Sequence, residues 1–283
     1  MAFMNMKTAA TVCCFVLASN VAHAACLDDP AADALGQALL DGMLAPTPGV
    51  ETLEEGYCTQ AKVVEWMSPV LGGVAGYKAG LTSAPAQERF GVEQPVSGVL
   101  LHGMLLQDGA MVPTPYGARP VFEADLVVTV SDSAINQAMT PDDVLKSLSD
   151  VRPFIELPDL VVENPSTLQG PQIAAINVGA KLGVLGAAVP VEQTPEFLTA
   201  LSDMTVTMTD QNGNELSSAP GSIVLGHPLN AVLFLIDRGV ELRPGDIVSV
   251  GSIGPLLPPQ SGLTVTATYE GLPGTPTVSV TFQ

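Results

Sequence analysis

Positively charged residues are scarce in this sequence. Its 283 residues include 10 Lys and Arg against 29 Asp and Glu, which gives a formal net charge of −19 at pH 7. A field of that sign repels the phosphates of nucleic acids and anionic membrane surfaces, so we expect neither as a partner. A small anionic ligand would need a local cation, from a lysine or a metal ion, to offset the field.

Long apolar runs are also missing after the first residues. Lys7, the short apolar segment 8–21 and the A-x-A pattern at 22–24 have the form of a secretory signal peptide, so we expect residues 1–24 to be removed. The apolar segment is too short to span a membrane, and no later run is long enough. A lipoprotein acylated at Cys26 is an alternative, although the usual preceding Leu is absent. The pattern predicts a periplasmic or secreted protein.

Cysteine is rare, with 4 in the whole chain. Cys13 and Cys14 lie in the expected signal peptide, which leaves Cys26 and Cys58. An even pair in an exported protein predicts one disulfide, and this one would tie the mature N-terminus to a helix. Two separate thiols are the alternative, which an oxidising compartment disfavours.

The remaining composition is that of a folded domain. Hydrophobic residues make up 47% of the chain and charged residues 14%, which argues against disorder. Segments 28–44 and 59–71 have helical spacing, and Ser83 is typical of the N-cap of a short helix over 84–90. Strand-like runs dominate after that, and we interpret the apolar run 173–185 as a buried strand. The order predicts an α+β fold with a β-rich core.

Two carboxylates share one face of the most strand-like run. Segment 121–130 (VFEADLVVTV) holds no Gly or Pro, and residues i and i+2 of a strand point to the same side, so Glu123 and Asp125 lie side by side. A divalent cation would remove the cost of burying two like charges. An edge strand with both acids in water is the alternative. Glu156, in the apolar run 152–157, is the natural third ligand of the pair for Mg²⁺ or Mn²⁺. If Glu156 stood alone, a carboxylate at the rim of the fold would be the alternative.

Lys78 and His227 are further site candidates. Lys78 lies between glycines in segment 76–83 (GYKAGLTS). A lone lysine is usually a solvated surface charge, but the small neighbours and the shortage of cations favour a site role. His227 precedes a helical segment over 229–238, where it fits either a site residue or a capping histidine.

A series of short motifs runs through most of the chain. In order they are GYKAGLT (76–82), GVEQP (91–95), FEAD (122–125), FIE (154–156), LGHPLNA (225–231), PGDIV (244–248) and GSIGP (251–255). Together they resemble the 2-keto-4-pentenoate hydratase and 4-oxalocrotonate decarboxylase branch of the fumarylacetoacetate hydrolase superfamily. The resemblance implies a mixed β-roll core with flanking helices. It also implies a catalytic domain over 76–283 that forms one compact unit with an N-terminal helical region over 25–75.

The resemblance implies a metal-dependent site as well. Glu123, Asp125 and Glu156 match the family's metal-binding acids, which implies Mg²⁺ or Mn²⁺ as cofactor. Lys78 matches its active-site lysine, which could stabilise a substrate carboxylate or carry a proton. The cation would hold the carboxylate and 2-oxo group of a small 2-keto acid and stabilise an enolate-like charge.

The substrate contacts that the resemblance implies are Leu81, Thr82 and His227, and here the sequence also departs from the family. Val96 stands where the family has an acidic residue, Gly179 where it has a serine, and 160–161 (Leu-Val) where a Ser-Arg pair is usual. Lys181 replaces a usual glycine, and we expect it to add a cation to the substrate site. Fold and metal site are therefore expected to be retained, and the proton-transfer and substrate contacts to have changed.

Three functions follow from this pattern. The favoured one is an exported metal-dependent lyase, of the hydratase or decarboxylase type, for a small 2-keto or 2-hydroxydienoic acid. A non-catalytic periplasmic protein that binds such an acid through a retained metal pocket is the alternative, favoured by the changes at Val96 and Gly179 and opposed by the retained Lys78. A hydrolase of C–C bonds is disfavoured, because such enzymes need an upstream His and no His follows the signal peptide before His102. Assembly into a homo-oligomer is common in the family and stays open here.

Overall fold

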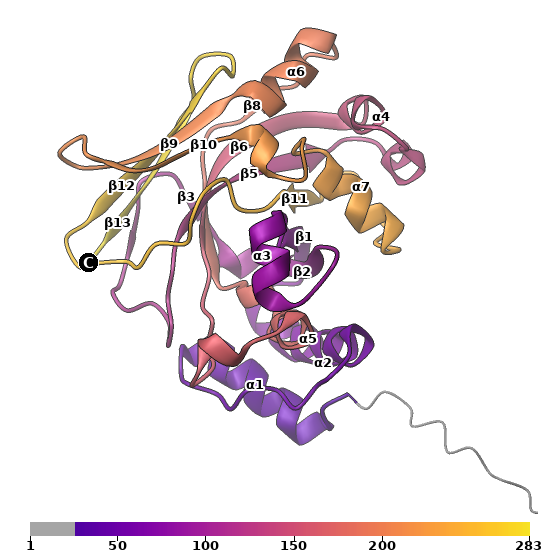
Figure 1. The fold of residues 1–283 in the computed structure, drawn as a ribbon, viewed down its shortest axis with the longest axis vertical. Helices are drawn as coiled ribbons and strands as arrows, with labels where there is room; N and C mark the ends of the chain where they lie inside the picture. Colours follow the sequence, from indigo (N-terminus) through magenta and orange to yellow (C-terminus); the bar gives the residue numbers. More distant parts are fainter. Residues whose placement is uncertain (1–25) are drawn as a thin grey trace, which may run out of the picture.

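The computed structural model describes residues 26–283 (Figure 1). The expected signal peptide over 1–24 therefore lies outside the described residues. Helices in this part are α1 (Asp29–Asp41), α2 (Leu53–Leu71), α3 (Ala84–Phe90), α4 (Pro141–Leu145), α5 (Gly170–Ala175), α6 (Pro195–Asp203) and α7 (Asn230–Asp237). None of the helices between residues 26 and 283 has the length and hydropathy needed to cross a bilayer.

The strands form two sheets. They are β1 (Val74–Gly80), β2 (Val96–Leu101), β3 (Leu105–Gln107), β4 (Ala110–Val112), β5 (Glu123–Val130), β6 (Leu148–Leu157), β7 (Leu182–Leu185), β8 (Val189–Pro190), β9 (Thr205–Asp210), β10 (Glu215–Pro220), β11 (Ile247–Ser249), β12 (Thr264–Glu270) and β13 (Thr277–Phe282). The larger sheet has the order β2-β1-β11-β5-β6-β7-β3, with β8 beside β6, and the smaller has β10-β9-β12-β13-β4.

Both sheets are mixed. In the larger sheet β1 is parallel to β11 and β3 is parallel to β7, while β5 is antiparallel to both β11 and β6. In the smaller sheet β13 and β4 are parallel. Figure 1 shows the smaller sheet on one side of the long β5–β6 pair, with α3 and α7 on the other side and α1, α2 and α5 at the base. The predicted α+β class with a mixed β-rich core and flanking helices is confirmed.

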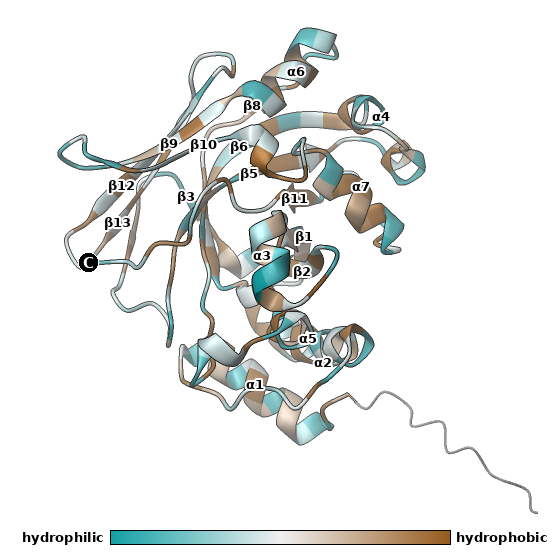
Figure 2. Ribbon diagram, in the orientation of Figure 1, coloured by the Kyte–Doolittle hydropathy of each residue, from teal (hydrophilic) through white to brown (hydrophobic). Residues whose placement is uncertain are grey.

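Apolar side chains fill two clusters that hold these layers together. The larger cluster joins the two sheets and includes the aromatic rings of Phe122, Tyr269 and Phe282. The second lies among the N-terminal helices and joins Leu35 of α1 and Val63 of α2 to Leu101 of β2. In Figure 2 helix α3 and the turn from β9 to β10 are hydrophilic, as expected for segments that face water. The N-terminal helices therefore share a core with strands of the larger sheet.

Two of the predicted elements need correction. Helix α2 begins at Leu53 rather than at residue 59, because Thr52 and Glu55 form a capping box at its start. The apolar run 173–185 is a strand only at its end. Its first residues complete α5, and a tight 3-10 turn over Asn177–Gly179 precedes β7. Apolar content alone does not distinguish a buried strand from a buried helix.

The predicted disulfide between Cys26 and Cys58 is present. Their Cα atoms are 5.4 Å apart, so the start of the described chain is fastened to α2. Lys62 of α2 adds to this attachment by donating to the Leu27 carbonyl, at 2.9 Å.

Replacing Cys58 by Ser is expected to lower the free energy of unfolding by about 3–4 kcal/mol. The bridge joins residues 32 positions apart, and closing a loop of that length restricts the unfolded chain. Urea unfolding of the oxidised protein and of the variant measures the difference. Reduction of the wild-type protein should produce the same loss, and an unchanged unfolding midpoint would contradict the prediction.

Candidate metal and substrate site

Strands β5 and β6 bring the predicted acids together. Their antiparallel register sets Glu123 opposite Glu156, and Asp125 is two residues further along β5 on the same face. All three side chains are buried. The edge-strand alternative is wrong, because β5 lies inside the larger sheet between β11 and β6.

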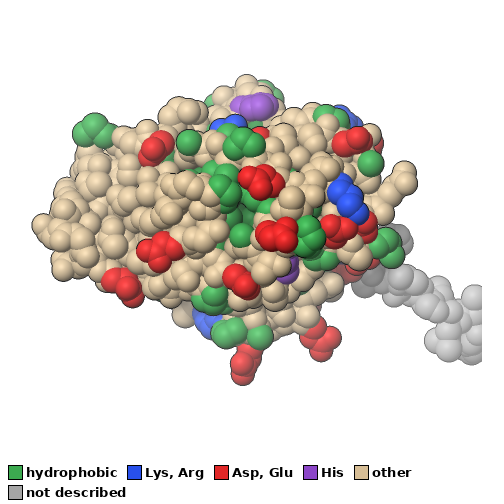
Figure 3. Space-filling model, turned by 90° about the horizontal axis from the view of Figure 1, so that it is seen from above, with side chains coloured by type: hydrophobic (Ala, Val, Ile, Leu, Met, Phe, Trp, Pro, Cys, Tyr) green, Lys and Arg blue, Asp and Glu red, His purple; other side chains and the backbone are tan. Residues whose placement is uncertain are grey.

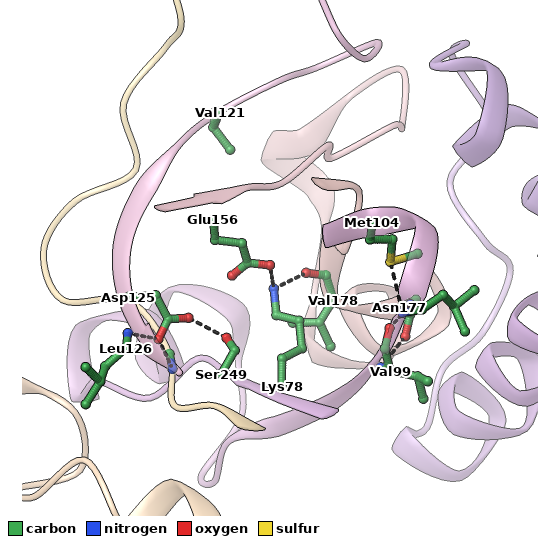
Figure 4. Close-up of polar contacts among 12 residues, drawn as sticks. Lys78, Val99, Met104, Val121, Asp125, Leu126, Glu156, Asn177, Val178 and Ser249 are labelled. Atoms are coloured by element: carbon green, nitrogen blue, oxygen red, sulfur yellow. Dashed lines mark hydrogen bonds and ion pairs between the residues drawn. The ribbon is translucent and has the colours of Figure 1, made fainter. Parts of the chain in front are cut away.

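Lys78 reaches this acidic face from β1. Its Nζ forms an ion pair with Glu156 Oε1 and donates to the Val178 carbonyl oxygen, at 3.1 Å (Figure 4). The side chain is 3% exposed, so the reading as a solvated surface charge is wrong. In the larger sheet, β11 and β5 lie between β1 and β6. The contact of Lys78 on β1 with Glu156 on β6 therefore requires the sheet to curl around the site.

Asp125 is held by donors from β11 and from the loop that follows it. Ser249 donates its hydroxyl to Oδ2, and the backbone N–H of Gly251 donates to Oδ1 at 3.0 Å. Burial, followed by the charge of Glu156, raises the pKa of Asp125 to about 7. Burial and the same neighbour raise the pKa of Glu123, and Lys78 offsets part of that rise. The raised pKa values mean that the surroundings disfavour the charged forms of these acids, because three ionised carboxylates would carry more negative charge than Lys78 alone balances.

The residues fit a divalent cation in donor type and in charge. Glu156 Oε2 is buried and has no hydrogen-bond partner, while its Oε1 is occupied by Lys78. Carboxylate oxygens are the donors that Mg²⁺ and Mn²⁺ prefer, and a cation would neutralise the excess charge. In residues 26–283, however, no three His, Cys, Asp or Glu side chains converge on a common point. Figure 4 shows why, since Glu156 points at Lys78 and Asp125 points at Ser249.

A cavity of about 190 Å³ opens beside these residues. Lys78 and Glu123 line it, together with Leu81 and Thr82, the two substrate contacts expected from the motif at 76–82. The backbone of Leu81 adopts a positive φ of 56°. The remaining walls are mainly apolar and come from α3, α5 and the loops at 158–160, 178, 223 and 252–256.

Lys181 and His227 lie outside the residues that line this cavity. Lys181 Nζ instead donates to the carbonyl oxygens of Leu39 and Leu40 at the end of α1, and burial lowers its pKa. Cations are favoured at helix C-termini, and the expected role of Lys181 in the substrate site is therefore wrong. His227 Nδ1 accepts from the Leu229 N–H at 3.1 Å, and Nε2 lies 3.0 Å from the Leu198 carbonyl oxygen, which is the capping alternative.

A turn that was not predicted from the sequence positions Lys78. Asn177 and Val178 both have positive φ, which is rare for a β-branched residue, and this turns the Val178 carbonyl toward Lys78 Nζ. The Asn177 side chain fixes the turn to β2 by accepting from the Val99 N–H at 2.8 Å and donating to the Val99 carbonyl at 2.9 Å. Neighbouring Asn and Gly at 177 and 179 were the available signal, because both tolerate this conformation.

Replacing Gly80 by Ala is expected to destabilise the fold by about 1–3 kcal/mol and to slow turnover. An added Cβ would lie 2.3 Å from Val178 Cγ1, so Val178 must move, and its carbonyl holds Lys78. Urea unfolding and steady-state kinetics measure the two effects. Gly49→Ala is the matched control, because nothing lies within 4 Å of its added Cβ. Equal behaviour of the two variants would contradict the role given to this contact.

Comparison with known proteins finds relatives that cover most of this chain. No family model matches the chain. The 2-keto-4-pentenoate hydratase of Paraburkholderia phymatum is 32% identical over 231 residues, which cover 78% of this chain and 86% of that protein. The TodF product hydratase of Pseudomonas putida is 30% identical over 244 residues, 82% of this chain and 87% of the relative.

Solved structures share the same fold. The 4-oxalocrotonate decarboxylase from Pseudomonas putida G7, complexed with magnesium and adipate, superposes with a TM-score of 0.78. It is 24% identical, and the match covers 90% of this chain and 97% of that one. The mixed β-roll expected from the motifs is thereby confirmed. With a hydratase at 32% identity over most of both chains, this protein belongs to the 2-keto-4-pentenoate hydratase family.

Proposed function

We propose that the protein is a metal-dependent lyase, of the hydratase or decarboxylase type, that acts on a small 2-keto or 2-hydroxydienoic acid. The observation that carries the proposal is the buried pair of Lys78 and Glu156, whose second carboxylate oxygen has no hydrogen-bond partner. An uncompensated buried acceptor is costly, and a bound cation would satisfy it. The relatives' names support the same class of reaction.

Glu123, Asp125 and Glu156 are the residues that would hold the cation. When bound, a divalent ion supplies a Lewis acid that fixes the carboxylate and 2-oxo group of the substrate and stabilises enolate-like charge. The protein contributes the rest. Lys78 Nζ, at the buried end of the cavity, binds the substrate carboxylate or holds a proton that it can transfer, and the apolar walls exclude water and strengthen both interactions.

Export to the periplasm is part of the same proposal. The signal-like sequence over 1–24 and the pairing of Cys26 with Cys58 support it, since such bonds persist in oxidising compartments. Fractionation of the expressing cell, followed by N-terminal sequencing, tests it. Material that stays in the cytoplasm with its first residues intact would refute export.

The second candidate is a protein that binds a 2-keto acid without turning it over. Val96 is buried and apolar where the family has an acid, and among the described residues that line the cavity only Glu123 could serve as a carboxylic acid. The discriminating experiment adds 2-hydroxypenta-2,4-dienoate to the Mn²⁺-loaded protein and follows its absorbance. Loss of the diene signal supports the lyase, whereas saturable binding with no loss supports the binding protein.

A further inference from the structure

A buried tyrosine of the smaller sheet reaches the two strands that carry the predicted metal ligands. Tyr269 of β12 is fully buried in the apolar cluster that joins the two sheets. Its hydroxyl accepts from the Phe154 N–H at 3.1 Å and donates its proton to the carbonyl oxygen of Asp125 or, at 3.0 Å, to that of Phe154. One side chain thus contacts the backbone of both β5 and β6.

These contacts lie at the level of the acids. Asp125 and Phe154 face each other in the register of β5 and β6. Glu123 and Glu156 form the facing pair two positions away. The side chain of Asp125 is held from the β11 side of the sheet, whereas its backbone carbonyl is held by Tyr269 from the other sheet. The site is therefore fixed from two directions.

We propose that Tyr269 is a positioning residue for the metal site. Its hydroxyl holds β5 and β6 at the spacing at which their acids can share one divalent cation. The inference rests on the proposed function, and it adds to the site a residue that does not line the cavity. The smaller sheet then has a part in metal binding, although the acids are all on the larger one.

Packing alone does not account for the hydroxyl of Tyr269. Phe122 and Phe282 fill the same cluster with rings that carry no polar atom. A hydroxyl buried in an apolar core costs free energy unless it is hydrogen-bonded, so a phenylalanine would be the simpler filling. The partners of this hydroxyl are backbone groups of the two strands that bear the acids. Its placement favours a role in holding those strands.

Metal affinity is sensitive to the spacing of the strands. Mg²⁺ requires oxygen ligands in near-octahedral geometry at about 2.1 Å. A shift of β6 against β5 would move the Glu156 carboxylate relative to those of Glu123 and Asp125. Groups that orient metal ligands without contacting the ion typically change metal affinity about 10- to 100-fold. Loss of the Tyr269 hydroxyl is expected to have an effect in this range.

The charge of the whole molecule also attracts cations, and it must be separated from this local effect. The formal net charge is −19, and acidic side chains outnumber basic ones on the face seen in Figure 3. Such a field raises the local concentration of any divalent cation. Replacing Tyr269 by Phe changes no charge, so this contribution is the same in both proteins. A difference in affinity must then come from the positions of the acids.

Titration calorimetry with Mn²⁺ compares the wild-type protein with Tyr269→Phe. We expect the dissociation constant for Mn²⁺ to rise about tenfold or more in the variant. The electron paramagnetic resonance spectrum of the bound ion, recorded at saturating Mn²⁺, should change as well, because it reports the symmetry of the ligands.

Val265→Ala is the matched control for a loss of stability. Val265 is fully buried on the same face of β12, four residues before Tyr269. We expect this variant to unfold at a lower urea concentration and to keep the wild-type Mn²⁺ affinity and spectrum. Equal Mn²⁺ affinity in wild type and Tyr269→Phe, or an equal loss in both variants, would overturn the inference and leave the proposed function standing. A wild-type protein that binds no Mn²⁺ would overturn both.

A measurement on the wild-type chain covers the case in which Tyr269→Phe does not fold. The sequence has 4 Tyr, so after labelling with 3-fluorotyrosine the Tyr269 fluorine resonance is the one that remains when Tyr57, Tyr77 and Tyr116 are each replaced by Phe. Saturation with Mg²⁺ is expected to shift this resonance, because the hydroxyl is bonded to the Asp125 carbonyl. The Tyr57 resonance, whose hydroxyl bonds to Ser97 of β2, serves as the reference. An unshifted Tyr269 resonance in protein that calorimetry shows to bind Mg²⁺ would overturn the inference.

Discussion

Replacing Lys78 by Met is expected to reduce turnover of a 2-hydroxydienoic acid about 10³-fold while Mn²⁺ still binds. A positioned acid–base group contributes roughly 10²–10⁴ in rate. Among the described residues that line the cavity, Lys78 is the cationic one, and its Nζ pairs with Glu156. Met preserves most of the buried volume without the charge. Initial rates and Mn²⁺ titrations of the same preparation separate the two effects.

The control for this substitution is another lysine without a role in the site. Lys146 is exposed and pairs with Asp142 on the surface helix α4. We expect Lys146→Met to leave both turnover and Mn²⁺ affinity unchanged, because exposed pairs contribute little. Wild-type turnover in a folded Lys78→Met variant would remove Lys78 from the reaction.

Replacing Glu123 or Glu156 by Ala is expected to lower the affinity for Mn²⁺ at least about tenfold, which corresponds to about 1.4 kcal/mol. Each substitution removes one buried carboxylate, a candidate metal ligand, from the face shared by β5 and β6. Glu123→Ala is the cleaner variant, because Glu156→Ala also leaves the Lys78 ammonium buried without its partner. Calorimetric titration with Mn²⁺ measures the affinities.

An acid of equal charge on the surface provides the comparison. Glu215 is exposed at the start of β10, and Glu215→Ala should leave the isotherm as it is in the wild-type protein. An unchanged isotherm in both Glu123→Ala and Glu156→Ala would refute the metal assignment.

Local rules were sufficient to predict the acidic face. The alternation of a strand sets Glu123 and Asp125 on one side, and an apolar run around Glu156 marks it as buried. The facing register of Glu123 and Glu156 depends on the pairing of β5 with β6. That pairing joins segments separated by a helix, and alternation within one strand does not determine it.

The errors concern side chains whose partners are distant in sequence. Lys181 was expected in the substrate site because it replaces a usual glycine, yet its Nζ donates to two α1 carbonyls that lie 142 and 141 positions earlier in the chain. Asn177 and Gly179 signalled a turn, but nothing in the sequence indicated that Val178 between them also adopts a left-handed conformation. Its conformation is stabilised by tertiary contacts, through the bonds of Asn177 to Val99. Sequence patterns predict strands, helices and helix caps well. They predict poorly which group a single long side chain contacts.

The most direct test of the account is calorimetric titration of the protein with Mn²⁺, in the presence and absence of oxalate, which mimics the enolate of a 2-keto acid. We expect Mn²⁺ to bind to the protein alone and oxalate to bind only when Mn²⁺ is present. Such a result would show that Glu123, Asp125 and Glu156 form a working chelate site beside Lys78. The absence of Mn²⁺ binding would contradict the metal-dependent reaction proposed for this site.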